Sequence, residues 1–331
     1  MSKLLPTYLI EFLEHLEIER NRSDKTTKNY HFYLSRFIDW LGKGKSPKDI
    51  TAEDVRKFRL WLNRLVDIHG EPLKKNTQNY HLIALRSFLK YLAKRDVETL
   101  NAEKIELMKM PDRDVTFLEQ GDINRLLEAP LRLLGDSKAG ETGQKASDRA
   151  RIILRDKALL ELLFCTGLRV SELAKLKKED INLLRDEFTV TGKGRKNRVV
   201  FLSEQAIYWL KRYLTARGDM NPFMFVSHDK NKKARLVSVK GKLQEEEAPL
   251  TSRSIQRIVQ KYTKIAGITK PVTPHTLRHT FATDLLQNGA DIRSVQSMLG
   301  HSSITTTQVY THITDKHLHD IHKKFHGKKR E

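Results

Sequence analysis

The first part of the chain carries hydrophobic positions three and four apart, which is the spacing of a helix face. Four helices are predicted there, and they cover residues 7–20, 23–42, 51–66 and 76–95. Ser23 and Thr51 are candidate capping residues for two of them. The stripes consist of Leu9, Phe12, Leu13 and Leu16, of Tyr30, Tyr33, Leu34, Phe37 and Leu41, and of Leu82, Leu85, Phe88, Leu89 and Leu92. They predict a compact helical bundle, in which we interpret the aromatic rings as core and not as base-stacking groups.

The helical pattern breaks after the fourth helix. A proline and a charged stretch at about residues 108–116 indicate a linker. We therefore expect two domains, a helical one at residues 1–110 and a longer one at residues 115–331. In the longer domain, residues 155–181 predict two helices that meet at Gly167.

Strands are expected only in the second domain. Residues 186–202 alternate apolar and polar positions on both sides of a glycine-rich turn, which is typical of a β-hairpin. Residues 223–227 are expected to add a third short strand. Two polar stretches, 135–149 and 228–250, are expected to be surface insertions without regular order. Further helices are expected at residues 251–266, 276–288 and 291–299. The whole pattern predicts a mainly α fold with a small β-sheet, in the α+β class.

Charge narrows the range of partners. Lysine and arginine outnumber aspartate and glutamate by 61 to 41, so the 331 residues carry a formal net charge of +20. A surplus of this size attracts polyanions, of which nucleic acid is the commonest, but charge alone does not separate an enzyme from a passive binder. The single cysteine, Cys165, lies in an apolar run, which indicates a buried thiol and a reducing compartment. We expect a cytoplasmic protein, because neither a signal peptide nor an apolar stretch of membrane length is seen.

Two stretches contain polar side chains that are candidates for binding or catalysis. Arg169 precedes Glu172 by about one helical turn, so the carboxylate can hold the guanidinium in place. Lys193 stands at the end of a predicted strand, where a lysine held near a phosphodiester can protonate a leaving oxygen or contact a base. Taken alone, each group also fits an ordinary solvated side chain.

Two further stretches contain histidine and tyrosine. His275 and Arg278 are spaced to point the same way from a helix, and His279 completes the i, i+4 spacing of a zinc-binding helix. The metalloprotease pattern needs glutamate directly after the first histidine, but Thr276 stands there, so zinc is the weaker interpretation. Tyr310 follows three threonines, which predicts a short helix held by packing and a tyrosine able to reach outward.

The order of these groups points to one chemistry. The segments "TGLRVSEL", "GKGRKNR", "HTLRHTFATDLL" and "LGHSSITTTQVYTH" follow one another along the chain. Together they resemble the catalytic motifs of the tyrosine recombinases, the phage-integrase family, and in particular its Xer branch. The resemblance covers essentially the whole chain, because family members carry an N-terminal helical, SAM-like core-binding domain that clamps DNA before the catalytic domain.

The resemblance implies a set of functional residues. Its catalytic members are Arg169, Lys193, His275, Arg278, His301 and Tyr310, with Glu172 as the acidic partner of the first arginine. Tyr310 corresponds to the nucleophile, and the two arginines correspond to the pair that holds the phosphate. The resemblance implies no metal, no ATP and no other cofactor. How acid and base work is divided between Lys193 and the histidines stays open.

The expected function is site-specific DNA recombination through a 3′-phosphotyrosine intermediate, of the Xer type that resolves chromosome dimers. The alternatives are an integrase of a phage or mobile element, a type IB topoisomerase, and a non-catalytic DNA-binding protein. The partners that the resemblance implies are a double-stranded DNA recombination site and a homo- or heterotetramer of recombinases, with an accessory DNA translocase as an optional partner and no membrane. Leu318, Ile321 and Phe325 have helical spacing, so the tail is expected to dock on a neighbouring subunit or to pack on its own domain.

Overall fold

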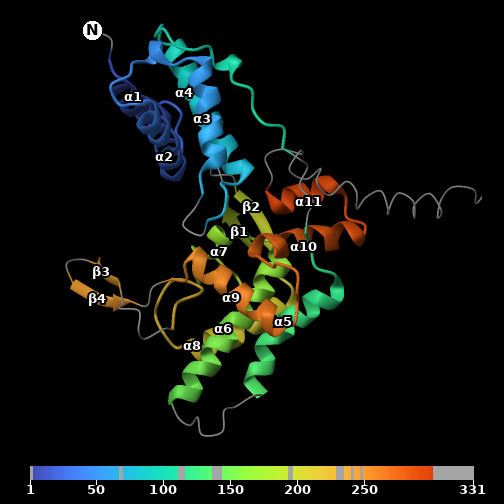
Figure 1. The fold of residues 1–331 in the computed structure, drawn as a ribbon. Coiled ribbons are helices and arrows are strands. Elements are labelled where there is room, and N and C mark those ends of the chain that lie inside the picture. The colour runs from blue at the N-terminus through green and yellow to red at the C-terminus, as the bar shows by residue number, and fades with distance from the viewer. Residues whose placement is uncertain are drawn as a thin grey trace, which may run out of the picture. The chain divides into compact units, whose positions relative to one another are not determined.

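The chain folds as two compact units, Met1–Asp112 and Arg113–Glu331 (Figure 1). This computed structural model describes residues 3–66, 70–110, 116–135, 144–192, 197–228, 235–239, 242–246 and 249–300. Within these residues the chain is mostly helical, with small antiparallel sheets of two strands each, so the predicted mainly α fold is confirmed.

The first unit is a helical bundle. Its elements are α1 (Leu5–Glu17), α2 (Asp24–Leu41), η1 (Pro47–Asp49), α3 (Ala52–Arg64), α4 (Lys75–Ala93) and η2 (Ala102–Lys104). Both predicted caps are present, because the hydroxyl oxygen of Ser23 accepts from the Thr26 N–H at 3.3 Å and that of Thr51 accepts from the Asp54 N–H at 3.1 Å. These side chains satisfy backbone donors that the first turn of a helix leaves without a partner.

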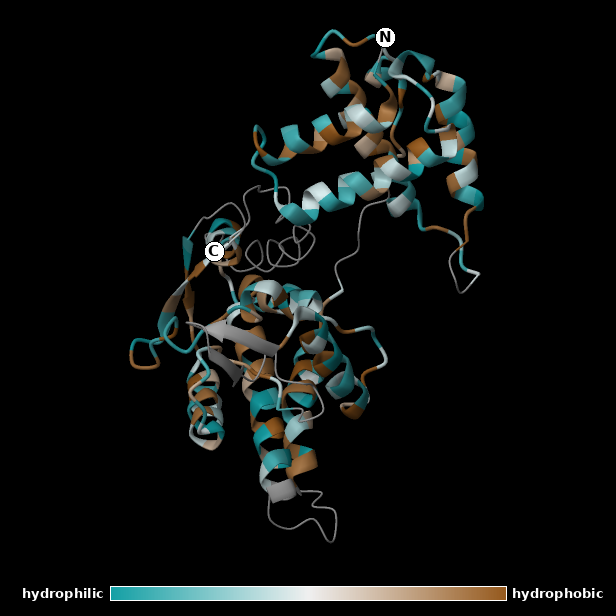
Figure 2. Cartoon of the chain, turned by 90° about the vertical axis from the view of Figure 1, so that its left-hand side faces the viewer, coloured by the Kyte–Doolittle hydropathy of each residue, from teal (hydrophilic) through white to brown (hydrophobic). Residues whose placement is uncertain are grey.

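The predicted stripes form the core of this bundle. Figure 2 shows hydrophobic and hydrophilic positions interleaved along the helices, as amphipathic helices require. Phe12, Phe37 and Phe88 are almost completely buried, and Phe12 meets the Phe88 ring edge-on at a centroid distance of 5.4 Å. The aromatic rings of these stripes therefore stabilise the bundle, as interpreted from the sequence.

The second unit is built around one long helix, α6 (Gln144–Thr166), which packs against α5 (Gln120–Gly135), α8 (Glu204–Arg217) and α10 (Pro274–Gln287). The other elements are α7 (Val170–Leu173), β1 (Glu187–Thr191), β2 (Asn197–Phe201), β3 (Arg235–Val239), β4 (Lys242–Glu246), α9 (Ser252–Ile265) and α11 (Ile292–Leu299). The predicted hairpin is the antiparallel pair β1–β2, whose register places Val190 opposite Arg198.

Three expectations for this unit were wrong. Residues 223–227 form no strand, because the segment makes single bridges on two sides, Phe223 with Lys177 and Val226 with Pro249, and a ladder needs successive pairs with one partner. The stretch 228–250 contains the hairpin β3–β4, whose first strand is rich in leucine and valine. Residues 144–149 of the stretch 135–149 are helical, because glutamine, lysine, alanine and arginine favour helix without forming an apolar stripe.

Two helices, α5 and α8, had no counterpart in the expected elements. Ser203 caps α8 by accepting from the Ala206 N–H at 3.2 Å. Trp209, Leu210 and Tyr213 then bury one side of this helix. A capping serine followed by apolar residues at this spacing is the signal that would have located the helix.

Candidate active site

A glycine turn places the first arginine. The helix α6 ends at Thr166, and Gly167 adopts a φ of +58°, a left-handed conformation that favours glycine. A Cβ at this position would lie 2.6 Å from the Phe281 Cδ1 atom, so the site also lacks room for a side chain. The turn sets Arg169 at the N-cap of the short helix α7.

Glu172 holds Arg169 as the spacing predicted. The Arg169 Nη1 donates to Glu172 Oε1 at 2.9 Å, and the Arg169 backbone N–H donates to Oε2 of the same carboxylate at 2.9 Å. The glutamate side chain is 8% exposed. Hydrogen bonds to both the backbone and the guanidinium therefore fix the start of α7 and the direction of the arginine.

A second arginine reaches the same carboxylate from the hairpin. Arg198 on β2 donates from Nη1 to Glu172 Oε1 at 3.1 Å and from Nη2 to Oε2 at 2.7 Å. Burial by itself raises the pKa of Glu172, but the hydrogen bonds and charges of Arg198 and Arg169 outweigh it and lower the pKa to about 2. Glu172 is therefore a carboxylate throughout the neutral and mildly acidic range.

The helix α10 supplies the second predicted arginine. Thr273 caps this helix by accepting from the Thr276 N–H at 3.2 Å, and Pro274 occupies its first turn. Arg278 is 5% exposed, and its Nη1 donates to the Gly167 carbonyl at 2.6 Å. Its Nη2 donates to the Leu299 carbonyl. The arginine thus joins the glycine turn to the end of α11.

The C-terminal end of α11 brings the arginines together. Three successive carbonyls each accept from a different guanidinium. Met298 accepts from Arg198 Nε at 3.0 Å, Leu299 accepts from Arg278 Nη2, and Gly300 accepts from Arg169 Nη2 at 3.1 Å. A helix C-terminus carries partial negative charge and carbonyls without intrahelical partners, so it attracts cations. This arrangement concentrates positive charge directly before residue 301.

His275 lies one turn before Arg278 on α10. The residue as a whole is exposed, but partial desolvation of its ring, followed by the charges of Arg278 and Arg169, lowers its pKa. The pKa of the half-buried His279 is lowered to about 4, chiefly by desolvation and then by His275 and Arg278. At neutral pH both imidazoles are therefore neutral, and a neutral imidazole can accept a proton.

The residues of both units match known protein families. Residues 139–317 match the phage integrase family, and residues 9–96 match the N-terminal SAM-like domain of phage integrases. The chain belongs to the phage integrase family.

Curated Xer recombinases are similar to this chain over nearly its full length. This recombinase is 37% identical over 319 residues to tyrosine recombinase XerD of Chlorobaculum tepidum, covering 95% of this chain and 94% of the relative. It is 33% identical over 337 residues to tyrosine recombinase XerC of Thermodesulfovibrio yellowstonii, covering 98% of this chain and 97% of the relative. The predicted family is confirmed, and the protein is a site-specific tyrosine recombinase of the Xer type.

A solved structure has the same fold. The XerH site-specific recombinase bound to a palindromic difH substrate, a post-cleavage complex, matches the recombinase with a TM-score of 0.64 at 22% identity. The match covers 95% of this chain and 82% of that one.

The structure places four of the seven predicted site residues. Arg169 donates to Glu172, Arg169 and Arg278 donate to the adjacent carbonyls of Gly300 and Leu299, and His275 lies close enough to both arginines for their charges to lower its pKa. The other three, Lys193, His301 and Tyr310, lie outside the described residues, as does the tail that carries Leu318, Ile321 and Phe325. Among the described residues, no group of three metal-binding side chains of the kind that holds an ion occurs.

Arg198 is a residue of this site that the sequence analysis missed. Its neighbours on the inward face of the hairpin are Phe188, Val190 and Val200, all buried. The signal that could have identified it is an arginine at a position where the alternation of the strand predicts an apolar residue. A charged side chain is rarely buried unless it is paired, so such a position indicates a buried ion pair.

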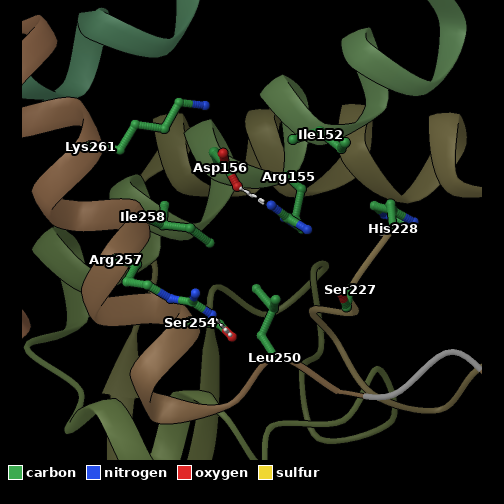
Figure 3. Close-up of a pocket in the computed structure, with 10 residues that line it drawn as sticks. All are labelled: Ile152, Arg155, Asp156, Ser227, His228, Leu250, Ser254, Arg257, Ile258 and Lys261. Atoms are coloured by element: carbon green, nitrogen blue, oxygen red, sulfur yellow. Dashed lines mark hydrogen bonds and ion pairs between the residues drawn. The ribbon is translucent and has the colours of Figure 1, made fainter. Parts of the chain in front are cut away.

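A larger pocket lies away from these residues. This cavity of about 590 Å³ is bordered by α6, α9 and the segment around His228 (Figure 3). Inside it, Arg155 donates to Asp156 Oδ1 at 2.7 Å and to the Val226 carbonyl at 3.0 Å, while the Tyr262 hydroxyl donates to Asp156 at 2.9 Å. The buried ion pair of this pocket is thus satisfied by other groups of the fold, and we assign it a structural role.

In the described part of the recombinase, we find no helix with the length and apolar character that crossing a membrane requires.

Proposed function

We propose that the recombinase holds the scissile phosphate of a DNA recombination site between Arg169 and Arg278. The observation that supports this is the common anchor of the two guanidiniums, because they donate to the adjacent carbonyls of Gly300 and Leu299. Guanidinium groups held side by side can bind the two non-bridging oxygens of a phosphodiester through charge-assisted hydrogen bonds.

The arginines act on charge that develops during the reaction. A phosphodiester is already anionic at neutral pH, and attack by a nucleophile adds negative charge to its non-bridging oxygens. Donors that are held in place before the reaction stabilise this charge without reorganisation, and removal of one such donor costs about 2.7–4 kcal/mol of transition-state stabilisation. The hydrogen bonds to Glu172, Gly167 and the end of α11 provide this preorganisation.

In the first step of the proposed reaction, the hydroxyl oxygen of Tyr310 attacks the phosphorus and loses its proton. The bond between phosphorus and the 5′ oxygen breaks, its electron pair stays on that oxygen, and a proton completes the 5′-hydroxyl. The protein then carries a 3′-phosphotyrosine. Attack by the 5′-hydroxyl of the partner strand reverses each of these changes and rejoins the DNA, so no net energy input is needed.

Proton transfer is assigned to the remaining residues. Tyrosine has an ordinary pKa near 10 and needs a base at neutral pH, and the neutral imidazole of His275 can take that role. We assign Lys193 as the acid that protonates the leaving 5′ oxygen, and His301 as a donor to the phosphate. The neutral state of His275 supports the first assignment, and the order of the motifs supports the other two.

We infer that the partners are double-stranded DNA and other recombinase subunits. The net charge of +20 favours binding to a polyanion. Strand exchange between two duplexes needs four cleavage events, hence four active sites in a homo- or heterotetramer. The near full-length similarity to Xer proteins favours chromosome dimer resolution as the biological role over integration of a mobile element.

A trapping experiment tests the proposal. The purified recombinase is incubated, with EDTA present, with duplexes that carry the host's recombination site and a nick beside each candidate scissile phosphate. We expect an SDS-resistant protein–DNA adduct that peptide mapping locates at Tyr310, and the Tyr310→Phe variant is expected to bind the duplex without forming the adduct. An adduct of normal yield from this variant would overturn the nucleophile assignment. The absence of any adduct from the wild-type protein would contradict the phosphotyrosine reaction itself.

A further inference from the structure

Arg198 connects three parts of the active site. Its side chain extends from β2 and donates two hydrogen bonds to the Glu172 carboxylate. Its Nε donates to the Met298 carbonyl at 3.0 Å. A Cβ placed on Gly300 would lie 2.9 Å from the Arg198 Cδ atom, so its stem also packs against the turn that ends α11. One side chain thus ties the hairpin to α7 and to α11.

We propose that Arg198 is a positioning residue for strand cleavage, which sets the direction of Arg169 through Glu172 and fixes the chain end that leads to residue 301. The inference rests on the proposed function, because it takes the arginines as the groups that hold the phosphate. Arg198 itself does not bind the phosphate. Both of its Nη atoms donate to the Glu172 carboxylate, which pairs its charge, and its Nε donates to the Met298 carbonyl.

Stability does not explain why an arginine stands here. The position faces the interior of the hairpin among Phe188 and Val200, where an apolar side chain would pack. A buried ion pair contributes little net stability, because desolvation of both charges offsets their attraction, and packed apolar residues are often as stable or more so. The arginine instead orients its partner, because the two donors of its planar guanidinium hold the Glu172 carboxylate in one orientation.

The hydrogen bonds of Arg198 to Glu172 and to the Met298 carbonyl hold two parts of the proposed phosphate site. Without the bonds from Arg198, Glu172 would, among the described residues, keep its bonds to the Arg169 guanidinium and backbone N–H, and the two bonds that hold its carboxylate from the hairpin would be lost. Without the bond to Met298, the end of α11 would lose one of the three guanidinium groups that its carbonyls bind in the described part of the chain, those of Arg169 and Arg278 remaining.

The test compares Arg198→Gln with Arg217→Gln. Arg217 is the matched control, because it is also buried, binds one carboxylate, Asp219, and donates to backbone carbonyls, but none of its hydrogen bonds goes to a described site residue, namely Arg169, Glu172, His275 or Arg278. For each protein we would measure the melting temperature, the Kd for the recombination-site duplex in a Tyr310→Phe background, and the single-turnover rate of adduct formation on nicked duplex at saturating protein.

We expect Arg198→Gln to bind DNA about as tightly as the wild-type protein and to form the adduct about 10- to 100-fold more slowly, by analogy with the loss of the residues that orient metal ligands. Arg217→Gln is expected to lower the melting temperature while the folded protein keeps its cleavage rate. Arg198→Lys retains the positive charge but lacks the two planar donors of a guanidinium. Its rate of adduct formation should therefore lie between those of Arg198→Gln and the wild-type protein.

The dependence of the rate on pH separates positioning from a general loss of structure. Glu172 faces Arg169 on its own turn and Arg198 on β2, while His275 and Arg278 face Arg169 from α10. In Arg198→Gln, burial still raises the pKa of Glu172, but the hydrogen bonds and charge of Arg198 no longer lower it. The pKa of Glu172 should therefore be higher in this variant than in the wild-type protein. The rate of this variant relative to wild type should therefore fall as the pH decreases toward this raised pKa. Titration of His275 is common to both proteins and cancels in this ratio.

Glu172→Gln completes the design, and it serves alone if Arg198→Gln does not fold. It should be slow with no such pH dependence of the ratio, and the double variant should be no slower than the slower single one. A wild-type rate for Arg198→Gln, a constant rate ratio across pH, or additive effects in the double variant would overturn the proposal. If the wild-type protein forms no adduct, the proposed function fails instead, and the two failures are distinguishable.

Discussion

Replacement of Gly167 by alanine tests the turn on which the arginine arrangement depends. A residue with a side chain costs about 1–2 kcal/mol in the left-handed conformation that Gly167 adopts, with a φ of +58°. The added Cβ would lie 2.6 Å from Phe281 Cδ1 and 3.2 Å from Leu299 Cδ2. Such overpacking costs about 1–3 kcal/mol more. The expected loss of unfolding free energy is therefore about 2–5 kcal/mol.

Gly218 provides the matched control. It has a φ of +65°, but a Cβ there would meet nothing within 4 Å, so Gly218→Ala carries only the backbone cost of about 1–2 kcal/mol. For a unit of this size, each kcal/mol lowers the melting temperature by about 2–4 °C. Differential scanning calorimetry should therefore show a larger decrease for Gly167→Ala than for Gly218→Ala.

The activity of the two variants should differ as well. The Gly167 carbonyl accepts from Arg278 Nη1 at 2.6 Å, so a displaced turn moves a guanidinium that we place on the phosphate. We expect slower adduct formation by Gly167→Ala below its melting temperature and an unchanged rate for Gly218→Ala. Equal decreases in melting temperature would refute the steric argument, and a wild-type cleavage rate in Gly167→Ala would refute the link between this turn and Arg278.

Two further predictions concern protons and assembly. The pKa of His275 is lowered, and the neutral form that serves as base exists above that pKa, so the acid limb of wild-type cleavage should lie below the ordinary histidine value of about 6.5. A single-turnover pH profile with this limb at or above that value would contradict the assignment of His275. Deletion of residues 315–331 should abolish strand exchange but preserve binding to a single site in a gel-shift assay, and exchange that survives the deletion would exclude docking of the tail.

Local patterns in the sequence predicted most of the helices. Hydrophobic stripes and capping residues such as Ser23 and Thr51 are patterns within one or two turns, so they can be recognised without knowledge of any tertiary contact. The short polar start of α6 and the hairpin β3–β4 were misjudged because their residues form secondary structure without an extended apolar pattern. Residues 223–227 were misjudged for the opposite reason, since an apolar segment was read as a strand before its partners were known.

The family, the expected catalytic set and the pairing of Arg169 with Glu172 could be predicted from the residues, because motif order and one-turn spacing are properties of the chain. That Arg198 shares this carboxylate, from a strand 26 positions away, became visible in the folded protein. The fold also brings Arg198, Arg278 and Arg169 to three successive carbonyls at the C-terminal end of α11 and its cap residue Gly300. Such contacts depend on how helices and a hairpin pack against one another, and the electrostatic attraction of a helix end for cations appears only once that packing has brought them together.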